Sequence, residues 1–397
     1  MLGFLGLDIG KDTFTAAFLW LGDDGKQHTL NPQSFSADQA GWQAFLRLWQ
    51  SQPPAEWHVG LESSGPYTRL YLHHLQTLPH PVYLISPLQA RHFRRSRSLR
   101  KAKTDRIDAQ TLAAWLFSAW QEGRLPRPAQ PPTSLRDLAF LYHQLTQELT
   151  RLQNRFRQVL HTLFPELERR QRRFPKSLRR LLQVYSSAQQ IAQAAPEDLQ
   201  PFCHRLACSP ETLQALATTS WGIHDEVAIA HLRHLLALWE ELEARRHQVW
   251  LTLRQQVRQT YPDAWRRLRP IPGLGDRLLT LFLALLGDLH RFPSAKSLIA
   301  FVGLDPSVYQ SGSFLAHGRL SKRGSPLLRH VLFLIAQALV RFSLRFRRIF
   351  LHHRQRGRAY RAALVIVARK ASPSSTSSLC VNELSKTSLL RLRVAYS

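Results

Sequence analysis

The first 120 residues alternate apolar runs and amphipathic stretches in an order that few folds accommodate. Two runs of β-forming residues, 2–9 and 13–20, are separated by three residues that predict a tight turn. The further predicted elements follow in chain order: a strand over 28–35, a helix over 37–50, a strand over 56–62, a helix from 66 to about 78, a strand over 81–85, a helix from 86 and a helix after 104. Three strands in a meander are thus followed by helix, strand, helix, strand, helix.

This order is that of the ribonuclease H-like fold, an α/β fold with a mixed sheet flanked by helices. Four carboxylates lie where the order would gather them. Asp8 stands at the end of the first strand and Glu62 at the end of the fourth, while Asp105 and Asp108 share one face of the helix capped by Thr104. Carboxylates so close repel one another unless metal ions neutralise them, and two Mg²⁺ ions about 4 Å apart serve phosphoryl transfer in such sites.

Each carboxylate also has an ordinary structural interpretation. Asp105 and Asp108 would offset the dipole of a first helical turn, Asp8 could be a turn residue before Gly10, and Glu62 could cap the next helix. The Asp-Ile-Gly sequence at residues 8–10 also opens the phosphate loop of actin-like ATPases and sugar kinases. Those proteins need a Gly/Thr-rich hairpin after it, and Lys11-Asp12-Thr13 follows here.

The charge balance indicates an anionic partner. The chain has 54 Lys and Arg against 27 Asp and Glu, and only nine of the basic residues are lysine. Arginine favours bidentate phosphate contacts, so nucleic acid is the leading candidate partner. The sequence contains no apolar run of the roughly 18 residues that a membrane span needs, and no signal peptide is recognised at its start. Cys203, Cys208 and Cys380 fit neither a disulfide framework nor a zinc site, so we expect a cytoplasmic protein.

The composition divides the rest of the chain. We expect a catalytic domain over 1–123, a proline-rich linker over 124–134, a helical region over 135–264 and a largely helical C-terminal domain over 265–370. A narrow stripe of leucines predicts a long helix over 135–163, and a second long helix is predicted over 226–261. The two would form an antiparallel coiled-coil hairpin used for dimerisation, or an ordinary bundle within a monomer. Residues 166–225 between them are expected to form a small helical insertion.

Two stretches of the C-terminal domain carry candidate phosphate contacts. Residues 269–288 resemble a helix-hairpin-helix unit, in which the turn at Gly273 and Gly275 would offer backbone N–H groups to a DNA phosphate; a plain turn is the alternative. Residues 310–313, Gln-Ser-Gly-Ser, predict a small flexible loop whose Ser311 could either bind phosphate or attack it. Basic residues surround that loop: Arg319, Lys322, Arg323 and Arg329.

Several of these motifs together resemble a known family. The stretches at 7–12, 61–67 and 103–113 are similar to the first domain of the DEDD transposases of the IS110/IS1111 insertion sequences. Pro-Gly-Leu-Gly at 272–275, the stretch 301–306, Gln-Ser-Gly at 310–312 and the stretch 319–329 resemble their second domain. The resemblance covers roughly residues 3–120 and 265–370, and does not separate the IS110 from the IS1111 branch.

The resemblance implies a RuvC-like first domain with Asp8, Glu62, Asp105 and Asp108 as Mg²⁺ ligands, and a serine nucleophile in the second domain. The nucleophile falls on Ser311, with Ser313 as its rival. It also implies DNA cutting and rejoining through a serine–DNA intermediate in a homo-oligomer, a dimer or a tetramer, and in the IS110 branch a structured guide RNA. Residues 372–397 depart from the family pattern, which motivates the hypothesis of a frameshifted or degraded end.

The leading prediction is therefore a DNA transposase or recombinase. The basic run before Asp105 is expected to contact phosphate beside the acidic site; it comprises Arg94, Arg95, Arg97, Arg100, Lys101 and Lys103. Two other functions fit the same residues. One is a RuvC-like nuclease for branched DNA that uses metal-activated water, and the other is a nucleic-acid-binding protein without catalysis.

Overall fold

The computed structural model describes most of the chain as two compact units, Met1–Thr133 and Ser134–Ser397. The described residues are 1–62, 67–97, 104–129, 134–171, 173–203, 208–292, 294–311, 314–322 and 324–371. For residues 291, 306–311 and 314–319 only the backbone is described. The linker and tail predictions at residues 130–133 and 372–397 lie outside the described residues, as do Cys380, Ser313 and Arg323.

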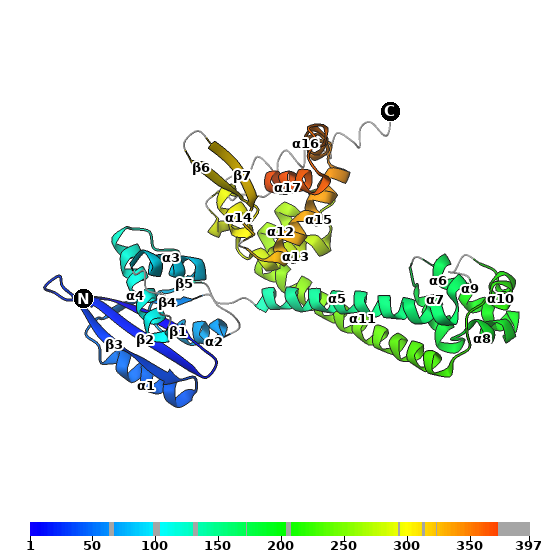
Figure 1. Cartoon of the computed structure of the whole chain (residues 1–397), viewed down its shortest axis with the longest axis horizontal. Coiled ribbons are helices and arrows are strands. Elements are labelled where there is room, and N and C mark those ends of the chain that lie inside the picture. The colour runs from blue at the N-terminus through cyan, green and yellow to red at the C-terminus, as the bar shows by residue number, and fades with distance from the viewer. Residues whose placement is uncertain are drawn as a thin grey trace. The chain divides into compact units, whose positions relative to one another are not determined.

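The first unit is built on a mixed five-stranded sheet with the order β3-β2-β1-β4-β5 (Figure 1). The strands are β1 (Leu2–Ile9), β2 (Thr13–Leu21), β3 (Gln27–Ser36), β4 (Glu56–Glu62) and β5 (Val82–Ile85). β2 lies antiparallel to both β1 and β3, whereas β4 pairs in parallel with β1 and with β5. This mixed sheet fits the predicted ribonuclease H-like fold, and its strands lie where the sequence pattern predicts them.

Helices cover both faces of the sheet. One core contains α1 (Gln39–Gln50) and α2 (Thr68–Leu75) with Leu5, Leu7 and Trp57. The other contains α4 (Asp105–Gln121) and Ala90 of α3 (Pro87–Arg97) with Phe4 and Tyr83. Alternate residues of a strand face opposite ways, so the all-apolar strands that the sequence shows are buried on both sides.

The second unit is almost wholly helical in its described part. Its long helices are α5 (Ser134–Leu163) and α11 (Glu226–Thr260), which are joined by five shorter ones: α6 (Pro165–Arg170), α7 (Lys176–Val184), α8 (Ala188–Gln193), α9 (Pro196–Cys203) and α10 (Pro210–Thr218). Six more helices follow: α12 (Pro262–Leu268), α13 (Asp276–Leu286), α14 (Ala295–Val302), α15 (Pro326–Phe342), α16 (Leu344–Gln355) and α17 (Tyr360–Ala371).

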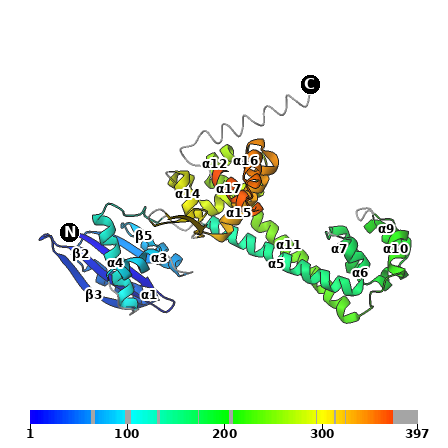
Figure 2. The ribbon, with the colours of Figure 1, turned by 45° about the horizontal axis from the view of Figure 1, so that its top comes forward.

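The two long helices pack side by side and antiparallel, as Figure 2 shows. Leu135 at the start of α5 shares a core with Val257 near the end of α11. At the other end of the pair, Phe156 of α5 shares a second core with Trp239 of α11 and with the shorter helices α6–α10. The paired helices therefore connect two separate cores. The structure contains one copy of the chain, so dimerisation through these helices stays a prediction.

The region around Ser311 differs from the sequence prediction. Where a loop was expected, β6 (Pro306–Ser311) and β7 (Phe314–Leu320) form an antiparallel hairpin beside α14. Gln310 and Ser311 therefore end a strand, and only the two residues that follow them, outside the described part, separate it from the next strand. Among the described residues, no single helix is long and apolar enough to cross a membrane; α15 and α16 pass that test only together, bent by 104° at their junction.

Candidate functional site

The first two predicted site residues, Asp8 and Glu62, stand side by side at one edge of the sheet. Leu7 lies opposite Leu61 in the parallel register of β1 and β4, and Asp8 and Glu62 are the next residue on each strand. Glu62 is also opposite Ile85 of β5. The carboxyl ends of parallel strands meet at one edge, where open α/β sheets bind their ligands. The parallel pairing of β1 with β4 thus brings together two carboxylates that are far apart in the sequence.

Two glycines show on which face of the sheet these carboxylates lie. A Cβ atom at Gly6 would lie 2.1 Å from the backbone oxygen of Ala109 in α4, and one at Gly60 would lie 2.8 Å from Leu116 of the same helix. Residues two apart on a strand share a face. Asp8 and Glu62 therefore lie on the face that α4 covers, and Gly6 is needed because the helix backbone passes too close for any side chain.

The first turn of α4 supplies the other two predicted carboxylates. Thr104 caps the helix, and its hydroxyl accepts a hydrogen bond from the Ile107 amide at 3.3 Å. Asp108 is largely buried, with its side chain 15% exposed, and its Oδ1 accepts a hydrogen bond from Nη1 of Arg94 at 2.6 Å. Asp105 is exposed one turn earlier. The three-residue spacing is therefore that of a helix, but the two carboxylates have different surroundings.

Glu62 and Asp108 line the same pocket, which has a volume of about 360 Å³. Arg91, Arg94 and Thr111 line it as well. Pro87, Ala90 and Leu112 form its apolar part. The structure thus brings together Glu62 and Asp108, places Asp8 on the strand position beside Glu62, and leaves Asp105 outside the lining. Arg91 and Thr111 were not singled out from the sequence, since neither residue type is distinctive on an arginine-rich helix or within a helix interior.

The donors fit a hard divalent cation in their chemistry, because carboxylate oxygens are the ligands that Mg²⁺ prefers. Their present arrangement holds Asp108 in an ion pair with Arg94. Within the described ranges, no three His, Cys, Asp or Glu side chains are grouped closely enough to hold a metal ion. The Arg94 guanidinium contacts Oδ1 of Asp108, so a metal at this edge of the sheet would share this carboxylate with Arg94 or compete with it.

The basic run predicted beside the site begins on α3. Arg94, Arg95 and Arg97 lie in the last turn of that helix, where cations complement the helix dipole. Arg95 and Arg97 are exposed, and the guanidinium of Arg97 lies 5.1 Å from the centre of the Phe93 ring. Of these three arginines, only Arg94 lines the pocket of Glu62 and Asp108, which is called the acidic pocket below. The remaining predicted members, Arg100, Lys101 and Lys103, are outside the described residues.

The predicted serine loop is described only in part. The backbone of Ser311 pairs with Phe314 at the end of the β6–β7 hairpin, and Arg319 lies in β7. Lys322 is exposed, with a left-handed backbone at φ 52°. Arg329 of α15 donates hydrogen bonds from Nη1 to the backbone carbonyls of Val302, Lys322 and Gly324, at 3.2, 3.1 and 2.6 Å. Arg329 therefore ties the backbones of Lys322 and Gly324 to the end of α14.

The predicted glycine turn precedes α13. Gly273 has a left-handed backbone, at φ 84°, and Gly275 caps the helix with open space on its Cα. Asp276 occupies the first position of α13 and pairs with three arginines, Arg254 and Arg258 of α11 and Arg269, at 2.9, 3.3 and 2.8 Å. The Asp276 carboxylate therefore pairs with the arginines around the N-terminus of α13, next to the turn where the sequence predicted a phosphate contact.

Comparisons with known proteins give one family for both ends of the chain. Residues 5–165 match the model of the IS110-type DEDD transposases, and residues 265–351 match that of the transposase IS116/IS110/IS902 family. The pilin gene-inverting protein of Moraxella lacunata is 23% identical over 373 residues, covering 92% of each chain. The 43.6 kDa insertion element IS110 protein of Streptomyces coelicolor is 27% identical over 68% of this chain and 69% of its own length. The IS1111A transposase of Coxiella burnetii is 38% identical over 76 residues, 19% of this chain and 21% of that protein.

Proposed function

Because the chain belongs to the IS110/IS116/IS902 family of transposases, we propose that it cuts and rejoins DNA with a metal-dependent acidic site on its first unit. The family assignment makes it a transposase or recombinase of an insertion sequence. The first family model matches the first unit and α5 of the second, the other matches a later part of the second unit, and together they span more than half of the 397 residues. Beyond this family membership, we propose the catalytic site, its cofactor and the chemical step.

One observation carries the acidic site: Glu62 and Asp108, from different elements, line one pocket beside the strand position of Asp8. We assign metal binding to these three carboxylates together with Asp105. When bound, Mg²⁺ would polarise the scissile phosphate and offset the charge that develops on its oxygens. The chain's own contribution is to hold the carboxylates on a rigid sheet edge and a capped helix, with Arg91 beside them to contact the phosphate.

The proposed nucleophile is Ser311, at the end of β6. Its hydroxyl oxygen would form a bond to the scissile phosphorus, the bond from phosphorus to a deoxyribose oxygen would break, and the hydroxyl proton would pass through the solvent to the sugar oxygen that leaves. Support comes from the family resemblance of the Gln-Ser-Gly sequence and from the exposed Lys322 near the base of the same hairpin. Ser313 is the competing candidate.

Two partners belong to the same proposal. The net charge of +27 supports contact with many backbone phosphates of a nucleic acid. This applies both to DNA and to a structured guide RNA. The acidic residues and Ser311 lie in separate units, and a homo-oligomer would let the serine of one protomer meet the acidic site of another. The antiparallel pair of α5 and α11 is the proposed contact between protomers.

A trapped protein–DNA adduct tests the serine. The purified protein is incubated with Mg²⁺ and radiolabelled DNA that carries an element end, then denatured in detergent and separated by electrophoresis. Wild type and Ser307→Ala, a control on the same strand, should give a labelled protein band, and Ser311→Ala should give none. Loss of the band in Ser313→Ala alone would move the role to that residue. Cleavage without any adduct would favour the metal-activated water of a nuclease.

A further inference from the structure

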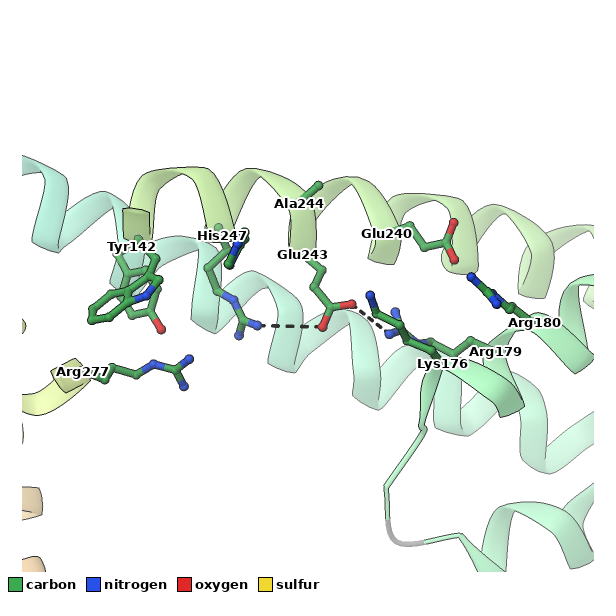
Figure 3. A pocket seen from close by; sticks show the side chains of 11 residues that line it. Tyr142, Lys176, Arg179, Arg180, Glu240, Glu243, Ala244, His247 and Arg277 are labelled. Carbon is green, nitrogen blue, oxygen red and sulfur yellow. Dashed lines mark hydrogen bonds and ion pairs between the residues drawn. The ribbon is translucent and has the colours of Figure 1, made fainter. Parts of the chain in front are cut away.

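A second pocket lies in the helical unit, between α7 and the paired helices α5 and α11 (Figure 3). Its volume is about 460 Å³, within the range of small-ligand sites. Five cationic side chains line it against two carboxylates, Glu240 and Glu243. The cations come from three helices that are far apart in sequence: Lys176, Arg179 and Arg180 of α7, Arg246 of α11, and Arg277 of α13. This excess of positive charge is not neutralised within the pocket.

Arg179 is the buried centre of this pocket. Its side chain is 5% exposed, and its Nη2 donates to Glu243 at 2.8 Å. The guanidinium also lies 4.9 Å from the centre of the Trp239 ring. Its Nε and Nη1 atoms are buried and have no hydrogen-bond partner within the described part of the chain. Buried donors normally have partners, so two unused N–H groups on a buried arginine indicate a ligand that accepts hydrogen bonds.

The surroundings of Arg179 favour an anion. Glu243 is shared, because Arg246 also approaches it at 4.0 Å, so one carboxylate faces two guanidinium groups (Figure 3). Lys176 is the first residue of α7, whose N-terminus has no side-chain cap. The open N–H groups and the positive end of the dipole add to the attraction for an anion there. Arg277 approaches from the opposite side of the pocket, over the Trp250 ring at 5.7 Å.

We propose that this pocket binds a backbone phosphate of a nucleic-acid strand. The inference rests on the proposed function for its partner, but it names a site apart from the acidic pocket and from Ser311. A phosphate is preferred over a carboxylate because the cations are mostly arginines, whose forked N–H groups match phosphate oxygens in pairs. Arg179 would donate to the phosphate, Arg180 and Arg277 would attract the strand from the two ends of the pocket (Figure 3), and Glu243 would keep the Arg179 side chain oriented.

The test compares two variants that each remove two positive charges from the same unit. Arg180→Gln/Arg277→Gln removes two exposed cations of the pocket. Arg151→Gln/Arg155→Gln removes two exposed cations of α5 that do not line it. Binding of the full chain to a labelled 40-base-pair DNA duplex and to a labelled RNA stem-loop is measured across a series of KCl concentrations. Thermal melting confirms that both variants fold.

The pocket variant should bind at least one of the two nucleic acids about tenfold more weakly at physiological salt, with a salt slope lower by roughly two. The control variant should stay within about twofold of wild type. Equal losses in both variants would show that only the overall charge matters and would overturn the proposal. Binding of poly-L-glutamate is measured in parallel. A loss of poly-L-glutamate binding in the pocket variant, with unchanged DNA and RNA binding, would also overturn the proposal. If the wild-type chain bound neither nucleic acid, the proposed function itself would fail. If wild type and the pocket variant bound both nucleic acids equally well, the proposed function would stand and only this inference would fail.

Discussion

Arg94 of α3 donates a 2.6 Å hydrogen bond to the carboxylate of Asp108 in α4, and so holds one of the four predicted metal ligands in an ion pair. The two side chains are 26% and 15% exposed. A pair that is largely removed from water is screened less than a surface pair. The same contact ties α3 to the first turn of α4 and keeps a cation at the place where a metal ion is proposed to bind.

Removing that guanidinium should favour the metal. Arg94→Gln is expected to bind Mg²⁺ roughly tenfold more tightly, because Asp108 loses a competing cation while keeping a neutral neighbour. Arg95→Gln removes the same charge from the exposed side of the same helix and should leave the affinity unchanged. Titration calorimetry with MgCl₂ measures both variants. Equal affinities in the two would mean that Arg94 does not compete with the metal.

The close approach of α4 to the sheet makes a prediction at Gly6. Gly6→Ala would place a methyl group 2.1 Å from the Ala109 carbonyl oxygen, so the helix backbone has to move away. The expected cost is about 3 kcal/mol in the free energy of unfolding, together with loss of Mg²⁺ binding as Asp108 shifts. Gly60→Ala meets only side-chain carbons, of Leu116 at 2.8 Å and of Ile85 at 2.9 Å, and should cost clearly less. Denaturant unfolding would contradict this if both variants lost the same stability.

Asp276 should stabilise the junction of α11 and α13. Three arginines converge on this one carboxylate, and Asp276→Asn leaves them facing each other. A loss of about 1–2 kcal/mol is expected, a modest value because the carboxylate is about a quarter exposed. Asp263→Asn, which removes an exposed carboxylate with one arginine partner, serves as the control and should be close to neutral. Thermal melting at low and high salt separates the two, since only the first loss should persist at high salt.

The first unit should lose stability in mild acid through His58. Burial lowers the pKa of His58 from its usual 6.5, although Glu56 acts in the opposite direction, and the ring shares a 2.9 Å hydrogen bond with the Tyr83 hydroxyl. The unfolded chain takes up the proton first, so this contribution is complete above about pH 6.5 and is lost as the pH falls through the lower folded value. Unfolding of wild type at about pH 7.5 and pH 5, compared with His58→Gln, measures it. The variant should show a smaller acid loss, whereas His73→Gln, at an exposed position, should behave as wild type.

The sheet could be predicted from the sequence because local pattern determines it. Apolar runs ending in Asp8 and Glu62 give two strands, and parallel pairing then forces both carboxylates to the same edge. Thr104 before Asp105 gives the start of α4 directly, since a capping hydroxyl marks a helix N-terminus. These features depend on a few neighbouring residues, and the structure has them where they were expected.

Contacts between distant segments could not be predicted in the same way. Arg94 belongs to a basic run, and nothing in its neighbourhood distinguishes the arginine that turns to Asp108 from those that point to solvent. The β6–β7 hairpin was missed because glycine, serine and proline around Ser311 are also typical of loops. The arginine pocket draws on α7, α11 and α13, so no single stretch of sequence carries its pattern.

If the carboxylates at the edge of the sheet are the catalytic ones, Glu62→Gln should lose the activity that Glu56→Gln keeps. Both residues lie on β4, Glu56 exposed at its start and Glu62 at its end, lining the acidic pocket. The measurement is cutting and rejoining of DNA carrying an element end, in Mg²⁺, with the two variants at equal concentration. Glu62→Gln should lose about 100-fold or more of the activity, and Glu56→Gln should keep wild-type activity. Undiminished activity in Glu62→Gln, with the protein folded, would contradict this assignment of the catalytic carboxylates.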